Sequence, residues 1–166
     1  MSEEYLDLVN ENDEVIDSQP RSWVYAQGKY NFRVINVFLK NSYGQLWIPR
    51  RTPHKELFPS CLDMSVGGHV SSGESYDETF TREVAEELNW DVNMLSYTVL
   101  GHATPRDGLC AYMRVYEIHA DEVPPYNPED FTEYMWLYPS ELHQRLADGD
   151  ISKGDLPILV DLFYSS

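Results

Sequence analysis

Residues 68–90 read GHVSSGESYDETFTREVAEELNW, a loop followed by a segment dense in carboxylates. Glu83, Glu86 and Glu87 stand at i, i+3 and i+4, so an α-helix places them on adjoining turns of one side. Like charges this close lower stability unless a positive group lies between them. A divalent cation meets that need, and Mg²⁺ favours a few carboxylates together with substrate phosphates. The stretch therefore predicts a helix that holds a metal ion.

Local signals define where this helix begins and ends. Ser75 with Glu78 fits a capping box, in which each side chain binds an N–H group at the helix start. An apolar stripe recurs every four residues and can be buried; its members are Phe80, Val84 and Leu88. Asn89 is the expected end, because Asn follows Gly as the residue that most often adopts the left-handed conformation. The glutamates border the stripe, where a metal ion would be held rigidly.

A solvated acidic helix face is the alternative interpretation, and it is the commoner fate of Glu-rich helices. Three residues nearby speak against it here, because Gly68, Glu74 and Arg82 fall at fixed offsets from the glutamates. A combination of this length favours a functional site over a charged surface.

This pattern resembles the Nudix box, G-x5-E-x7-R-E-U-x-E-E-x-G-U, where U is a bulky apolar residue. The residues that match it are Gly68, Glu74, Arg82, Glu83, Val84, Glu86, Glu87 and Trp90. The chain departs from the pattern at Asn89, where the family usually has Gly. That departure concerns loop geometry and leaves every carboxylate of the box in place.

The resemblance implies a fold and an activity. The fold would be an α/β/α sandwich with a mixed central sheet and an N-terminal β-hairpin, forming a single domain over residues 1–166. The activity would be hydrolysis of a nucleoside diphosphate linked to another group, or of a related small diphosphate, with Mg²⁺ or Mn²⁺. The enzyme would thus be a diphosphatase that acts on acid anhydrides.

The resemblance also implies roles for individual residues. The metal ligands would be Glu83, Glu86 and Glu87, which are also the catalytic residues, with help from the backbone at Gly68. Glu74 would pair with Arg82 and orient the carboxylates. A diphosphate repels an attacking water, so metal ions must neutralise charge and acidify that water, and a carboxylate serves as general base. Glu86 or Glu87 is the first choice for the base, and the remote candidates are Glu129, Asp130 and Glu133.

Further segments resemble the branch of the family that includes isopentenyl-diphosphate isomerase. They are the opening residues 5–16 and the segment 44–51. The isomerase itself is the alternative function, but its cysteine is absent from Ser65-Val66-Gly67-Gly68-His69. Two of its metal-binding histidines fall near Tyr25 and on Phe32, so only His69 remains. A non-catalytic diphosphate-binding module is the third possibility, although such a module is expected to lose box carboxylates.

Arg51 and Lys55 match positions that contact the diphosphate in the isomerase. Their chemistry suits phosphate, because Arg offers a planar fork and Lys a point charge. The alternative is a basic turn that faces solvent.

Composition limits the classes of partner. The formal net charge of −16 argues against a broad surface for nucleic acid or anionic membranes, so a small-molecule diphosphate is the expected partner. The start, Met1-Ser2-Glu3-Glu4, has no signal-peptide character, and no apolar run reaches membrane-spanning length, so a cytoplasmic location is expected. The two cysteines, Cys61 and Cys110, are expected to be buried free thiols.

The rest of the chain suggests alternating strands and helices, as in a layered α/β domain. Strands are predicted at residues 4–9, 13–17, 34–40, 45–49, 63–66, 97–103, 110–118 and 134–138. Helices are predicted at residues 21–26, 139–147 and 157–163. Five aromatic residues are candidates to stack on a base, with core packing as the alternative: Tyr30, Trp47, Tyr112, Tyr126 and Trp136.

Overall fold

The computed structural model describes residues 3–165. It opens with the predicted antiparallel hairpin, β1 (Tyr5–Val9) and β2 (Val15–Pro20), followed by the short helix α1 (Arg21–Ala26). Buried side chains fasten the hairpin to the rest of the molecule through a small core of their own: Leu6, Leu8, Val24, Phe32 and Ala111. Met1 and Ser2, which entered the signal-peptide argument, lie outside the described residues. No helix of residues 3–165 has the length and hydropathy needed to cross a membrane.

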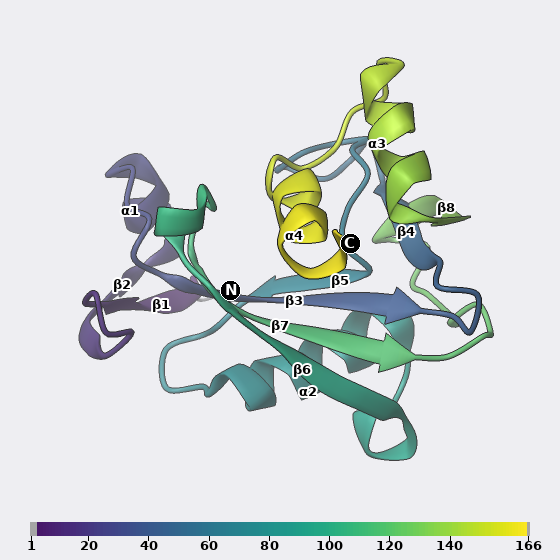
Figure 1. Cartoon of the computed structure of the whole chain (residues 1–166). Coiled ribbons are helices and arrows are strands. Elements are labelled where there is room, and N and C mark those ends of the chain that lie inside the picture. Colours follow the sequence, from purple (N-terminus) through teal and green to yellow (C-terminus); the bar gives the residue numbers. More distant parts are fainter. Residues whose placement is uncertain (1–2, 166) are drawn as a thin grey trace.

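The centre of the molecule is a mixed sheet (Figure 1). Its strands are β3 (Arg33–Lys40), β4 (Leu46–Arg51), β5 (Val66–His69), β6 (Ser96–Ala103), β7 (Tyr112–His119) and β8 (Phe131–Leu137). The spatial order is β6-β7-β3-β4-β8, and β5 pairs with β3 beside this path. The β3–β7 pair is parallel and the other pairs are antiparallel, which confirms the predicted mixed sheet.

Helices cover both faces of the sheet (Figure 1). On one face lies α2 (Tyr76–Leu88), and on the other lie α3 (Pro139–Ala147) and α4 (Asp155–Tyr164). Two single 3₁₀ turns flank β6, at Val92–Met94 and Pro105–Asp107. Because side chains alternate along a strand, Ile35 and Val37 of β3 join the core beneath α2, whereas Phe38 joins the core beneath α4. This is the α/β/α arrangement that the resemblance implied.

The predicted strand at residues 63–66 is wrong in its bounds, because β5 runs from Val66 to His69. Gly67 and Gly68 have low intrinsic strand propensity, so the sequence pattern did not include them. They form a strand nevertheless because they pair with Asn36 and Ile35 of β3. Tertiary pairing, not local preference, therefore extends the strand into the box.

Other bounds differ by a few residues. β7 begins at Tyr112 instead of 110, β8 spans 131–137 instead of 134–138, and α4 spans 155–164 instead of 157–163. β8 begins early because Phe131 pairs with Arg51 and is buried. α4 begins early because Pro157 is tolerated within the first turn of a helix.

The cysteine prediction is correct in one part and wrong in another. Both thiols are free, and Cys61 is buried as expected. Cys110 is exposed, and its thiol donates a hydrogen bond to an Asp155 carboxylate oxygen at 2.9 Å.

Candidate active site

The predicted carboxylate helix is confirmed, together with its capping box. The Ser75 hydroxyl accepts from the Glu78 N–H at 3.1 Å, and the Glu78 carboxylate accepts from the Ser75 N–H at 3.0 Å. Phe80, Val84 and Leu88 are buried as the apolar stripe required. Burial of this stripe fixes the rotation of α2, and with it the direction of the glutamates on the neighbouring side.

The helix ends at Asn89, which adopts the left-handed conformation with φ of 55°. The Asn89 side-chain amide donates to the Pro125 carbonyl at 2.7 Å. Next to it, the Asn127 N–H donates to the Glu87 carbonyl at 2.8 Å. The departure from Gly at this position therefore attaches the loop at 122–130 to the end of α2.

Two glycines of β5 let the carboxylates approach the backbone closely. A Cβ atom on Gly68 would lie only 2.3 Å from Cδ of Glu83, so no larger residue fits while Glu83 stays in place. The Gly67 N–H donates to an Oε1 of Glu87 at 3.4 Å. Glu83 and Glu87 thus reach the same pair of glycines in β5 from α2.

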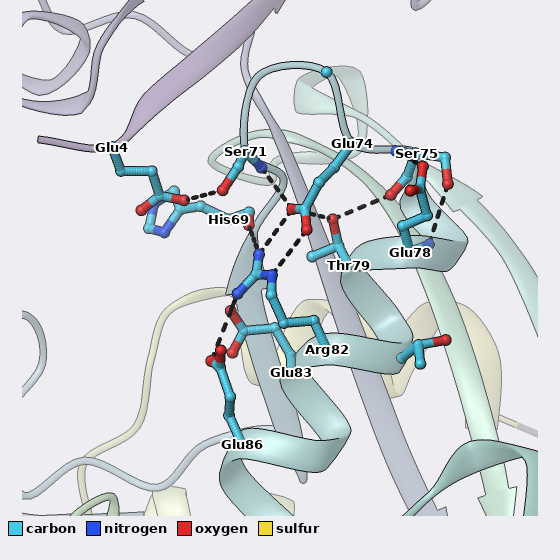
Figure 2. A network of polar contacts seen from close by, with 12 residues as sticks. Glu4, His69, Ser71, Glu74, Ser75, Glu78, Thr79, Arg82, Glu83 and Glu86 are labelled. Carbon is cyan, nitrogen blue, oxygen red and sulfur yellow. Dashed lines mark hydrogen bonds and ion pairs between the residues drawn. The ribbon is translucent and has the colours of Figure 1, made fainter. Parts of the chain in front are cut away.

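Arg82 lies at the centre of the network that joins the loop to the helix (Figure 2). Its guanidinium donates to both carboxylate oxygens of Glu74 at 2.8 Å, which is the ion pair implied by the resemblance. It also contacts Glu83 at 2.7 Å and Glu86 at 3.5 Å. Hydrogen bonds from Arg82 lower the pKa of Glu74 to about 2. Arg82 therefore keeps Glu74 ionised and holds the Glu83 carboxylate in a fixed direction.

The negative charges of Glu83 and Glu87 are only partly neutralised by Arg82. Burial raises the pKa of Glu83 to about 7, opposed by the Arg82 charge. Burial, reinforced by the negative charges of Glu83, Asp63 and Asp130, raises the pKa of Glu87 well above its usual value. A cation beside these groups would favour their ionised forms, so this part of α2 has the electrostatic character of a cation site.

The described residues hold no group of three or more His, Cys, Asp or Glu side chains that converge closely enough to bind a metal ion as they stand. Ion pairs with Arg82 account for part of this geometry, because Arg82 draws Glu83 and Glu86 toward itself. The donor set itself consists of carboxylates and the backbone of the two glycines of β5, which suits a hard cation such as Mg²⁺.

The raised pKa of Glu83 makes the stability of the metal-free protein depend on pH. Its folded-state pKa of about 7 lies above the usual 4.5, so between these values the folded protein binds a proton that the unfolded chain has released. The free energy of unfolding is therefore expected to fall as pH rises from about 4.5 through 7, by roughly 1–3 kcal/mol. Thermal unfolding with chelator from pH 5 to 8 measures this fall. Glu83→Gln should reduce the slope, and an equal slope in both proteins would contradict the assignment.

The glutamates border a cavity of about 980 Å³ that is also lined by basic side chains. The lining residues from the box and the glycine before it are Gly67, Gly68, His69, Ser71, Arg82, Glu83, Glu86 and Glu87. Arg51 and Lys55 line it as well, so both predicted substrate residues lie at the same cavity as the helix carboxylates. Arg51 is mostly buried and pairs with Asp63 at 3.0 Å, while Lys55 pairs with Asp130 at 2.6 Å. The basic turn therefore does not simply face solvent.

The three remote candidates for the general base differ in their position relative to the cavity. Asp130 lines the cavity, where its carboxylate binds Lys55. Glu133 instead pairs with Arg50 at 2.6 Å, and Glu129 is exposed. Of the three, the structure brings Asp130 to the cavity.

None of the five aromatic candidates for base stacking lines this cavity. Trp47 is fully buried and stacks with Tyr134 at 5.6 Å between ring centroids, which makes it a core residue. The cavity is instead bordered by Tyr25, Phe32 and Phe58. These residues are spread over separate segments without shared spacing, so the sequence offered no signal that would have grouped them.

His69 is enclosed by the first two of these rings. Its Nε2 lies 2.6 Å from the Tyr25 hydroxyl, and its ring stacks with Phe32 at 5.7 Å. Burial lowers the pKa of His69 to about 3, so His69 is neutral at physiological pH. Tyr25 and Phe32, near or at the places that the resemblance gives to two isomerase histidines, both contact the His69 ring.

Known proteins share this architecture. The NUDIX domain family model matches residues 30–157. An uncharacterized Nudix hydrolase of Nostoc sp. (strain PCC 7120) is 52% identical over 164 residues, covering 98% of this chain and 97% of that protein. A Nudix hydrolase of Deinococcus radiodurans is 48% identical over 165 residues, covering 99% and 96%. A crystal structure of a Deinococcus radiodurans protein superposes with a TM-score of 0.89 at 47% identity, covering 98% of this chain and 100% of that one.

Fold, site and relatives together define the chain as a hydrolase. It belongs to the Nudix family, whose members generally hydrolyse diphosphate bonds in nucleoside diphosphate derivatives.

Proposed function

We propose that the protein hydrolyses the diphosphate bond of a nucleoside diphosphate linked to another group, or of a related small diphosphate, with Mg²⁺ or Mn²⁺. One observation carries this proposal: the carboxylates of α2 and the basic residues Arg51 and Lys55 line the same cavity. A diphosphate needs both, because a metal ion on the carboxylates and fixed cations share its negative charge. The net charge of −16 supports a small anionic substrate over nucleic acid.

In this proposal Glu83, Glu86 and Glu87 would hold the metal ion, with backbone at Gly68 beside them. The ion would acidify a bound water and neutralise the phosphate oxygens. Glu86 or Glu87 accepts the proton of the attacking water, and Asp130 is the alternative from the loop side of the cavity. Arg82, fixed by Glu74, orients the Glu83 carboxylate.

Arg51 is proposed to bind the diphosphate, so Arg51→Ala should raise KM more than it lowers kcat. Its guanidinium also donates to the Leu57 carbonyl at 3.0 Å and to Asp63, which presents a fixed cation to the cavity. Loss of one charged hydrogen bond to phosphate corresponds to about a ten-fold change in KM. Steady-state kinetics on the preferred substrate measure the change. An unchanged KM would remove Arg51 from the substrate site.

The isomerase remains the second candidate, and the hairpin β1–β2 is the feature that supports its branch. Two observations favour hydrolysis instead. Gly67 stands where the isomerase has its cysteine, and the places of two metal-binding histidines hold Tyr25 and Phe32, which pack on His69. A non-catalytic module is disfavoured because all box glutamates are retained.

A magnesium-dependent activity screen tests the proposal. The substrates are nucleoside diphosphate sugars, ADP-ribose, dinucleoside polyphosphates, nucleoside triphosphates, coenzyme A and isopentenyl diphosphate. Release of phosphate or nucleoside monophosphate supports hydrolysis, and migration of a double bond supports the isomerase. Binding without any product would overturn the catalytic proposal in favour of a binding module. The expected cytoplasmic location stays a prediction that fractionation of cells would test.

A further inference from the structure

Lys153 is a cavity residue that the sequence pattern did not single out. It precedes the N-cap residue of α4, and its side chain reaches the cavity lined by the α2 carboxylates. The backbone of Lys153 is fixed, because its N–H donates to the Leu62 carbonyl at 3.0 Å and its carbonyl accepts from the Leu156 N–H at 3.1 Å. The backbone that carries the Lys153 side chain is therefore held in place.

Lys153 shares one buried carboxylate with Arg51. Asp63 is 2% exposed, and its Oδ2 contacts Arg51 at 3.0 Å and Lys153 at 3.3 Å. Two positive charges on one carboxylate leave a net charge of about +1 at this wall of the cavity. Only the carboxylate is deeply buried, since the Lys153 side chain remains 20% exposed. The cations are thus held together yet remain open to the cavity.

The ammonium also lies next to the carboxylate end of the site. A Cβ atom on Gly67 would lie 3.8 Å from Nζ of Lys153, and the N–H of the same glycine faces Glu87. Lys153 and Glu87 therefore approach one residue of β5, with no side chain at that residue to separate them. A diphosphate bound beside Glu87 would therefore meet the Lys153 ammonium in the same cavity.

We propose that Lys153 is a diphosphate-binding residue whose ammonium, held with the Arg51 guanidinium on Asp63, binds phosphate oxygens of the substrate. The proposal rests on the function proposed above and adds a residue from the α4 side of the sheet. Asp63 acts as a positioning residue, because it fixes both cations without itself lining the cavity.

The test compares Lys153→Met, which keeps the length of the stem, with Lys153→Arg, which restores a cation. Lys29→Met is the matched control, since Lys29 is exposed and lies outside the cavity lining. Two quantities are measured: KM and kcat on the substrate from the screen, and affinity for methylenediphosphonate by calorimetry with Mg²⁺. Lys153→Met should raise KM and weaken methylenediphosphonate binding by about ten-fold. Lys153→Arg should recover most of both, and Lys29→Met should match the unmodified protein.

Methylenediphosphonate separates this proposal from the hydrolytic one. If the screen finds no turnover but Lys153→Met still weakens binding of the probe, hydrolysis fails and the role of Lys153 stands. Unchanged binding of the probe in Lys153→Met, or no binding to the unmodified protein, overturns the role of Lys153. An equal loss in Lys153→Met and Lys153→Arg, with a lowered melting temperature in both, overturns it as well, because packing would then explain the loss.

Discussion

Glu87→Gln is expected to keep the fold and to lower turnover by about two orders of magnitude or more. Gln has nearly the volume of Glu, so packing around α2 is retained. The substitution removes a negative charge from a proposed metal ligand, and it also removes a candidate general base. Measurement of kcat over a range of Mg²⁺ concentrations separates the two effects, since lost affinity is partly recovered at high Mg²⁺.

Stability provides an independent readout for this variant. Burial and three neighbouring carboxylates raise the pKa of Glu87, so the ionised form is disfavoured in the metal-free fold. Glu87→Gln should therefore melt at a higher temperature than the unmodified protein in chelator at pH 8, although it is less active. Glu122→Gln is the matched control, because Glu122 is exposed on a loop outside the cavity lining. Full turnover in Glu87→Gln would show that the metal site lies elsewhere.

Gly68→Ala is expected to have the second largest effect. The new Cβ would meet Cδ of Glu83 at 2.3 Å and Cγ at 2.5 Å, which is too close for non-bonded carbon atoms. The obstructing atoms belong to a side chain, so Glu83 can rotate away while β5 stays paired. The fold should survive and turnover should fall by about one to two orders of magnitude, because a proposed metal ligand is displaced.

Gly154→Ala is the control for Gly68→Ala. Gly154 also lines the cavity, but its added Cβ would meet nothing within 4 Å and its φ is negative. It should retain turnover and melting temperature. Equal kinetics in the two alanine variants would show that the close approach of Gly68 to Glu83 has no part in the activity.

The sequence was most informative where structure is determined locally. The start of α2 at Tyr76 follows from Ser75 and Glu78, which lie three residues apart and need no distant partner. The burial of Phe80 follows in the same way from its four-residue repeat. Arg82 with Glu74 was reached through the resemblance, since Glu74 precedes α2 and Arg82 lies on the helix eight positions later.

The remaining features depend on contacts between residues far apart in the sequence, so the sequence did not predict them. Lys153 and Asp63 are 90 positions apart, and the parallel bridge between their neighbours Leu62 and Ser152 brings their charges within 3.3 Å. β5 itself was misplaced because its two glycines pair with β3 in spite of low propensity. Trp47 illustrates the reverse case: its aromatic ring suited stacking on a base, yet its place on the inner face of β4 buries it completely.

The hydrogen bond from Asn89 to Pro125 has a consequence for how substrate preference can change in this protein. With the Asn127–Glu87 bond beside it, this contact joins α2 to the wall of the cavity that carries Asp130. A glycine at 89 would relax the left-handed backbone but remove the side-chain bond to Pro125, leaving the Asn127–Glu87 backbone bond. Substitutions within residues 125–130 are therefore expected to change substrate selectivity where Asn89 is retained. Where Asn89 is replaced, the same substitutions are expected to loosen this wall of the cavity.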